Sequence, residues 1–159
     1  MSAPNVKLAV LLDLLESDHE EFTSMLDLKT GEMVLMEDGL VRAAEEGDEE
    51  SLNAVSEWQK PDAELARLIA ADDGQRFIQG PKKFDFHEYR HMERFIGTIE
   101  TEEIADQLWK AIKGKGAFRY FKDTAERLGL LERWFAYRDE AMKKFVLDWA
   151  GRRHIKVEV

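Results

Sequence analysis

The alternation of hydrophobic and polar residues over the first forty positions predicts one helix followed by a β-hairpin. From residue 6 to residue 16 the apolar side chains fall near helical spacing, and Asn5 precedes them as a candidate N-cap. Two strand-like runs follow, 22–28 and 32–36, joined by a short loop that ends in Gly31. Glycine supplies the positive φ that such a loop needs, so this segment is the clearest β signal in the chain.

After the hairpin the pattern predicts helices, interrupted by one further strand. Gly74 and Pro81 bracket a short extended run around Phe77 and Ile78, which we expect to form the third strand. Pro61, Asp85 and Thr101 suit the first turns of helices, and Gly129 and Gly151 suit their ends. The expected helices are Pro61–Ala71, Asp85 to about Ile99, Thr101 to about Lys113, Ala117–Leu128 and Leu131–Ala150.

Each of the last helices carries an apolar stripe, and such stripes normally face a core. The stripes consist of Tyr89, Met92, Phe95, Ile96 and Ile99; of Phe118, Phe121, Ala125 and Leu128; and of Leu131, Trp134, Phe135, Ala141, Met142, Phe145, Val146 and Trp149. A chain of 159 residues without an internal repeat fits one domain. We therefore expect a single α+β domain over 1–159, in which an N-terminal helix and a small antiparallel sheet pack with a mainly helical C-terminal half.

Composition narrows the classes of function. The chain has no cysteine, which removes disulfides, thiolate nucleophiles and cysteine metal sites, and it has no apolar run of membrane-spanning length or convincing signal peptide. The net charge is −10, but it is uneven: −11 over residues 1–60, −4 over 61–110 and +5 over 111–159. This asymmetry permits a basic face on an acidic protein, or attraction between the two ends of one fold.

The segment HEYRH offers a candidate zinc site, in which His87 and His91 would bind the metal and Glu88 would act as general base. On a helix this spacing places both imidazoles on one face. Against this hypothesis, Arg90 and Arg94 share that side, and no third ligand stands at a recognised spacing. A zinc-dependent hydrolase is therefore the alternative function, and a packed pair of histidines is the simpler interpretation.

Other catalytic motifs are absent. The chain contains no phosphate-binding G-x-x-x-x-G-K-[ST], no G-x-S-x-G and no G-x-G-x-x-G, so no catalytic residue and no cofactor is predicted. The acidic run 44–51 lacks the ligand spacing of a calcium loop, and we interpret it as a solvated segment between helices. Arg138 interrupts the stripe of the last helix, where a pair with a carboxylate would explain it.

The order of several segments suggests a family. These segments are LDLKTGEM, QRFIQGP, HEYRHMERFI and KGKGAFRYFKDTAERLGLLERWFAYRDEAM. Together they resemble the bacterial uncharacterised protein family 0158, closely from Arg76 to Trp149 and loosely before Pro61. The resemblance implies a fold and a bacterial, cytosolic setting, but no activity. The recurring piece of that family is HEY-x-x-Met, which His87, Glu88, Tyr89 and Met92 match. His91 is not part of this piece.

The most informative basic segment is KGKGAFRYFKD, residues 113–123. Its glycines allow a tight entry into a helix, whose first N–H groups and positive dipole end favour an anion. The candidate anion-binding residues are Lys113, Lys115, Gly116, Arg119 and Lys122. Tyr120 lies off the apolar stripe of this helix, where it could stack on a nucleic-acid base or pack on the last helix; we favour packing.

The sequence thus favours a non-enzymatic binding or regulatory module of the bacterial cytosol. Its partner would be an anion, namely a phosphate, a nucleic acid or an acidic protein. A membrane is not expected as a partner. The alternatives are the zinc-dependent hydrolase and a protein–protein role for the acidic N-terminal half.

Overall fold

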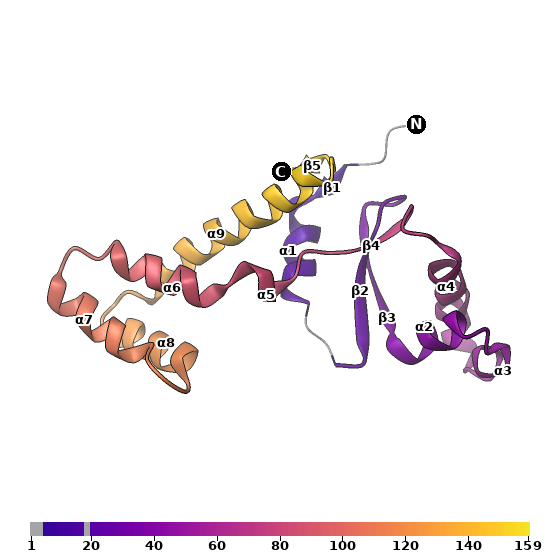
Figure 1. The fold of residues 1–159 in the computed structure, drawn as a ribbon, viewed down its shortest axis with the longest axis horizontal. Helices are drawn as coiled ribbons and strands as arrows, with labels where there is room; N and C mark the ends of the chain where they lie inside the picture. Colours follow the sequence, from indigo (N-terminus) through magenta and orange to yellow (C-terminus); the bar gives the residue numbers. More distant parts are fainter. Residues whose placement is uncertain (1–4, 18–19) are drawn as a thin grey trace. The chain divides into compact units, whose positions relative to one another are not determined.

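The structure, a computed structural model, describes residues 5–17 and 20–159 and divides into two compact units (Figure 1). The first, here called the sheet unit, comprises Met1–Lys82 and Val146–Val159. The second, the helical unit, comprises Lys83–Phe145. The expected α+β class is confirmed, whereas a single domain over 1–159 stays a prediction.

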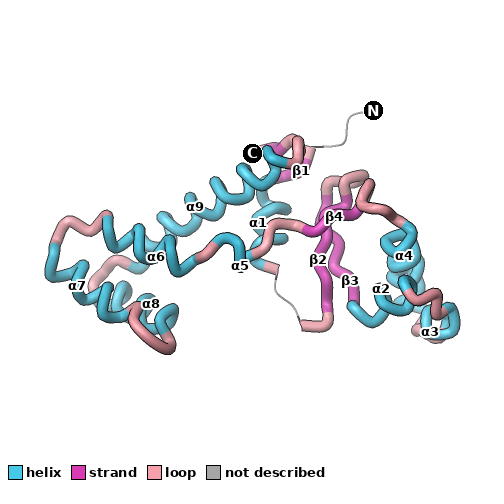
Figure 2. The backbone as a smooth tube through the Cα atoms, viewed as in Figure 1, coloured by secondary structure: helices cyan, strands magenta, loops and turns pink. Residues whose placement is uncertain are grey.

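The sheet unit contains the expected hairpin and third strand. Strands β2 (Phe22–Asp27) and β3 (Glu32–Glu37) pair antiparallel, and β4 (Phe77–Gln79) pairs antiparallel with the other edge of β2 (Figure 2). The order is therefore β3-β2-β4. Gly31 closes the hairpin with φ 76°, and its N–H donates to the carbonyl of Asp27 at 2.8 Å. The hairpin prediction is confirmed, and the loop works because glycine tolerates this left-handed conformation.

Three helices and a short 3-10 turn follow this hairpin and cover one of its faces. They are α2 (Asp38–Glu45), α3 (Glu49–Asn53), η1 (Glu57–Gln59) and α4 (Lys60–Ala71). Their buried residues join two strand residues in one core: Met36, Leu40, Ala43, Leu52, Ala63, Ala66, Ile69 and Phe77. The acidic run 44–51 is largely exposed and includes the end of α2 and the start of α3. Asp48 caps α3 by accepting from the N–H of Ser51 at 3.2 Å.

The N-terminal helix is present as α1 (Leu8–Glu16), with Leu11, Leu14 and Leu15 buried. Its start differs from the prediction. Strand β1 (Val6–Lys7) precedes it and pairs in parallel with β5 (Val157–Glu158), and Lys7 occupies the N-cap without a side-chain hydrogen bond. Asn5 therefore does not cap this helix. Two strands of two residues each are too short to leave a periodic signal in the sequence.

An ion pair with a buried carboxylate joins the hairpin to the third strand. Asp27, only 3% exposed, accepts from Nε and Nη2 of Arg76 at 2.9 and 3.0 Å. The Arg76 hydrogen bonds are the main cause that lowers the pKa of Asp27, and the N–H of Lys29 adds to it. The backbone of Arg76 also accepts from Leu28 N–H at 2.7 Å. These contacts hold β4 in register against β2.

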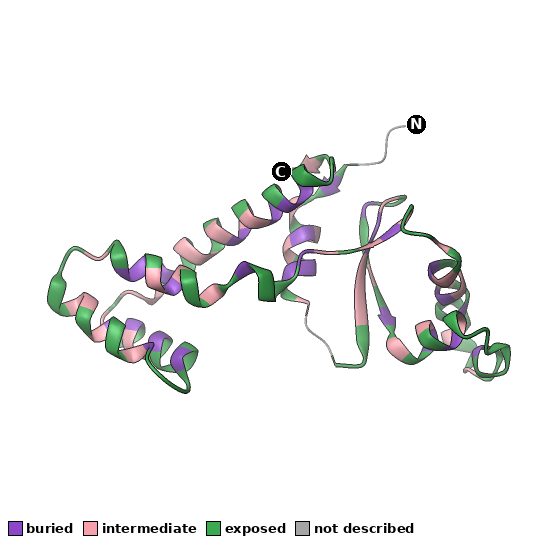
Figure 3. Cartoon of the chain, viewed as in Figure 1, coloured by how far each residue is buried: buried purple, intermediate pink, exposed green. Residues whose placement is uncertain are grey.

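The helical unit consists of α5 (Lys83–Phe86), α6 (Glu88–Gly97), α7 (Glu102–Ala111), α8 (Ala117–Arg127) and the first part of α9 (Leu131–Arg152). Buried positions recur along α6 and α8 at helical spacing (Figure 3). Four aromatic rings meet at the centre. Phe95 lies 5.4 Å from Trp134, 5.4 Å from Tyr137 and 6.2 Å from Phe121, and Phe121 lies 5.0 Å from Trp134, as centroid distances.

Three predictions about these helices are wrong in part. Asp85 does not cap a helix that runs to Ile99, since the chain turns at His87 and α6 begins at Glu88. Helix α9 ends at Arg152, one residue past Gly151, because glycine permits a helix to end but does not force it to. Phe118 and Phe135 are exposed, although both belong to predicted core stripes.

Replacing Phe121 by alanine should destabilise the protein strongly. Phe121 is fully buried among Phe95 and Trp134, so its removal costs hydrophobic transfer energy and leaves a cavity, about 3–5 kcal/mol in total. Chemical denaturation measures this change. Phe118→Ala in the same helix is the matched control, with an expected loss below about 1 kcal/mol since its side chain is half exposed. Equal effects of the two variants would contradict the described packing.

The Asp27–Arg76 pair predicts a specific pH dependence. Because the folded-state pKa of Asp27 is lowered, its stabilisation is complete above the ordinary aspartate pKa and disappears as pH falls through the folded-state value. We expect Asp27→Asn to lower the free energy of unfolding by about 1–3 kcal/mol at pH 7, with a smaller difference from wild type below about pH 4. Denaturation across this pH range measures it. The exposed Asp13→Asn serves as control, and a pH-independent difference would refute the assignment.

Candidate functional site

The HEYRH segment does not form the helix face that a zinc site requires. His87 has a left-handed backbone, with φ 54° and ψ 62°, and it precedes α6 instead of lying in its first turn. The two imidazoles therefore do not stand one turn apart on one helix, so that part of the sequence prediction is wrong. The ring of His91 stacks on Phe86 at 4.2 Å with an interplanar angle of 16°. Burial and the nearby Arg94 charge lower the pKa of His91.

Glu88, the candidate general base, is engaged elsewhere. Its carboxylate forms an ion pair with Arg138 of α9, and both side chains are mostly buried. This confirms the expectation that Arg138 pairs with a carboxylate. Within residues 5–17 and 20–159, no group of three His, Cys, Asp or Glu side chains is placed to hold a metal ion. The geometry does not favour the zinc-dependent hydrolase.

The turn between α7 and α8 carries the candidate anion-binding residues. Tyr89 of α6 anchors its beginning, since its hydroxyl donates to the carbonyl of Ile112 at 3.0 Å. Gly116 occupies the N-cap of α8 with φ 75°, and no side chain caps this helix. No side-chain cap therefore satisfies the first N–H groups of α8. An anion-binding helix entry requires such available N–H groups.

A second contact, besides its backbone conformation, favours glycine at position 116. A Cβ atom there would lie 3.0 Å from Cε2 of Tyr120, a tight contact that would make the ring shift slightly. The ring of Tyr120 thus lies against the backbone of Gly116, and the guanidinium of Arg119 stands 5.3 Å from the ring centroid. Tyr120 remains 48% exposed, with Gly116 and Arg119 beside its ring, whereas packing on the last helix was predicted.

The predicted cations lie together on this turn and helix. Lys113 and Lys115 are on the turn, and Arg119 and Lys122 are on the solvent side of α8 three residues apart; all four are exposed. None of them forms an ion pair with any residue that the structure describes. The structure therefore leaves four positive charges on one short segment without a carboxylate partner there.

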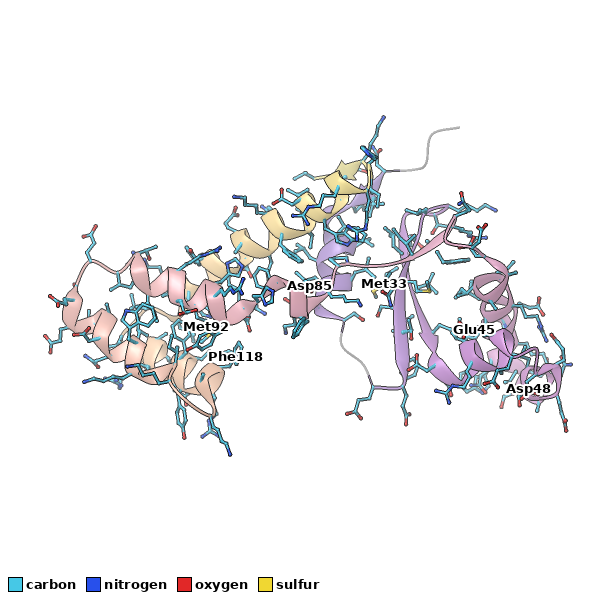
Figure 4. The ribbon with its side chains drawn as sticks, viewed as in Figure 1. Met33, Glu45, Asp48, Asp85, Met92 and Phe118 are labelled. Carbon is cyan, nitrogen blue, oxygen red and sulfur yellow. The ribbon has the colours of Figure 1, made fainter. Side chains whose placement is uncertain are left out.

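Sequence reasoning missed the exposure of Phe118 on α8, which was expected in the core and is 45% exposed (Figure 4). Lys110 and Trp109, near the end of α7, are also exposed. The signal for Lys110 is in the sequence, because residues 107–122 contain five lysines or arginines and no aspartate or glutamate. The signal for the exposure of Phe118 is weaker. Phe118 lies at the border of the apolar stripe of α8, where helical period alone does not distinguish buried side chains from exposed ones.

Comparison with models of protein families shows to which family the chain belongs. A model of an uncharacterised protein family, UPF0158, matches residues 54–159, which is two thirds of the chain. The chain belongs to the UPF0158 family. The matched region contains α4, β4 and the whole helical unit, including the α7–α8 turn, and it begins after the β2–β3 hairpin. Comparisons with curated proteins and with solved structures gave no match.

Membership of UPF0158 assigns no activity, so the chemistry must be inferred from the side chains.

Within the described ranges 5–17 and 20–159, none of the helices combines the length and apolar content needed to cross a membrane. The feature of this family member that stands out is the exposed, basic and aromatic surface of the α7–α8 turn.

Gly116→Ala should destabilise the protein more than Gly114→Ala. Both residues have positive φ, which costs a non-glycine residue about 1–2 kcal/mol, but only a Cβ at Gly116 meets Tyr120. Thermal or chemical denaturation measures the difference. The double variant Gly116→Ala/Tyr120→Ala isolates the contact with the ring. If the difference between the two glycine variants survives removal of the Tyr120 ring, that contact is not its cause.

Proposed function

We propose that this UPF0158 member is a non-enzymatic binding module of the bacterial cytoplasm that uses the α7–α8 turn to bind an anionic partner. The observation that carries the proposal is the group of exposed cations at Lys113, Lys115, Arg119 and Lys122 that has no ion-pair partner in the described residues. A protein with a net charge of −10 has many carboxylates available to pair with them.

The chemistry of the segment fits an anion with several charges. Lysine and arginine bind phosphate and carboxylate oxygens, and Arg119 offers the fork that holds two oxygens at once. The backbone at Gly116 and the uncapped start of α8 add N–H donors at the same place. Phosphate esters, nucleic acid and acidic protein segments all present such oxygens.

Removal of the four cations should abolish binding to a polyanion. The variant Lys113→Gln/Lys115→Gln/Arg119→Gln/Lys122→Gln keeps helix-forming side chains and lowers the positive charge by four. We expect the full-length protein to be retained on immobilised heparin at low salt and released as salt rises, and we expect the variant to pass through. Elution salt concentration is the measurement.

A second variant separates local binding from a general effect of charge. Lys7→Gln/Lys29→Gln/Arg42→Gln/Lys156→Gln removes four exposed cations of the sheet unit and changes the net charge by the same amount. It should elute like the unaltered protein. Loss of retention in both variants, or no retention of the unaltered protein even at low salt, would overturn the proposal.

A further inference from the structure

We infer that the anionic partner of the α7–α8 surface is single-stranded nucleic acid, bound through its phosphates by the cations and through its bases by exposed aromatic rings. The inference rests on the proposed function and specifies its partner. It is carried by an observation that the charges alone do not explain: aromatic side chains stand exposed among the cations. These side chains are Phe118 and Tyr120, with exposures of 45% and 48%.

Burial of Phe121 fixes where these rings stand on α8. An α-helix turns about 100° per residue, so Phe118 lies about 60° from buried Phe121 and Tyr120 lies about 100° from it on the other side. Arg119 points away from the core, about 100° from each ring. The exposed first turn of α8 therefore presents an aromatic ring, a cation and a second aromatic ring in succession.

Each ring on α8 has a cation beside it. The guanidinium of Arg119 stands 5.3 Å from the centroid of Tyr120, and Lys122 is one turn beyond Phe118 on the same side of the helix. A nucleotide in a single strand carries a phosphate next to an exposed base, and it fits such a pair, because the base stacks on the ring while the phosphate meets the cation.

Tyr120 is held in a defined position before any ligand arrives. Its ring packs against Gly116, and both the glycine conformation and the Arg119 contact restrict it. A ring that is already ordered loses less conformational entropy when a base stacks on it. An exposed aromatic side chain of this kind suits stacking better than a flexible one.

The surface does not suit a rigid partner. Phe118 and Tyr120 are about 160° apart around the helix, so one flat apolar interface or one stiff duplex cannot cover both rings, whereas a flexible strand can wrap around the helix start. Asp123 and Glu126 on the next turn confine the favourable region to a few nucleotides. A short single strand is therefore favoured over an acidic protein and over duplex DNA.

The test uses the full-length protein and three polyanions at equal salt. The probes are a labelled single-stranded oligonucleotide of mixed sequence, the same sequence as a duplex, and inorganic polyphosphate of similar charge as competitor. Fluorescence anisotropy should show tighter binding of the single strand than of the duplex, with weak displacement by polyphosphate. Phe118→Ala and Tyr120→Ala should each weaken single-strand binding at least about fivefold, and leave retention on polyphosphate unchanged.

Matched variants guard against loss of structure. Phe84→Ala and Phe135→Ala remove exposed aromatic rings elsewhere in the helical unit and should leave the affinity unchanged. Tyr120→Trp, which keeps a stacking ring, should retain binding, and melting temperature reports folding of each variant. If the aromatic variants bind single strands normally, or if duplex or polyphosphate binds equally well, the inference fails while the proposed function stands. If no polyanion binds, both fail.

Discussion

The contact between Phe121, Phe95 and Trp134 is the interaction on which the helical unit depends. It joins α8, α6 and α9 through their largest buried side chains, with Tyr137 completing the group. Once Phe121 is buried, helical period fixes the direction of its neighbours around α8. Arg119 then points away from the core, and Phe118, Tyr120 and Lys122 lie on the flanks of α8, where the neighbouring helices decide how far each is covered. The candidate surface is thus a geometric consequence of the core.

Three arginines elsewhere in the chain have carboxylate partners, unlike the cations of this surface. Arg76 pairs with Asp27, Arg138 with Glu88, and Arg67 with both Glu49 and Glu64. The carboxylates that pair with Arg76 and Arg138 are buried or mostly buried, so replacement of one member of either pair leaves the other uncompensated, whereas the Arg67 pairs lie at the surface. The cations of the α7–α8 turn have no such partner in residues 5–17 and 20–159. They are therefore unnecessary for internal pairing and free to meet a ligand.

Sequence reasoning succeeded where the physical signal is local or periodic. The β2–β3 hairpin has alternating apolar residues and a glycine at its loop, and Trp134 and Phe121 fall on strong stripes, so all of these could be predicted. The zinc hypothesis failed because it assumed a continuous helix. His87 adopts a left-handed conformation that no neighbouring glycine or proline announces. The β1–β5 pair joins chain ends and depends on tertiary contact alone.

For the anion-binding hypothesis too, some residues could be predicted from the sequence pattern, whereas others depend on how the helices pack. Lys113, Lys115, Arg119 and Lys122 could be selected from sequence because charge and glycine spacing are visible there. The exposure of Phe118 could not, since it lies only about 60° from a fully buried residue and neighbouring helices decide which of the two is covered. Sequence thus supports a general anion site, whereas the aromatic rings needed to select a nucleic acid become apparent only from packing.

We expect the net charge of −10 to limit which anions the proposed site can bind. At physiological salt the Debye length is about 8 Å, so a ligand in contact with the α7–α8 turn feels mainly the nearby cations. A long duplex extends well beyond that range and brings further phosphates toward an acidic protein, which opposes its binding. A short flexible strand can place its few phosphates at the cations without that cost. The local positive charge and the overall negative charge together favour a short single strand of nucleic acid. The exposed aromatic rings favour the same partner.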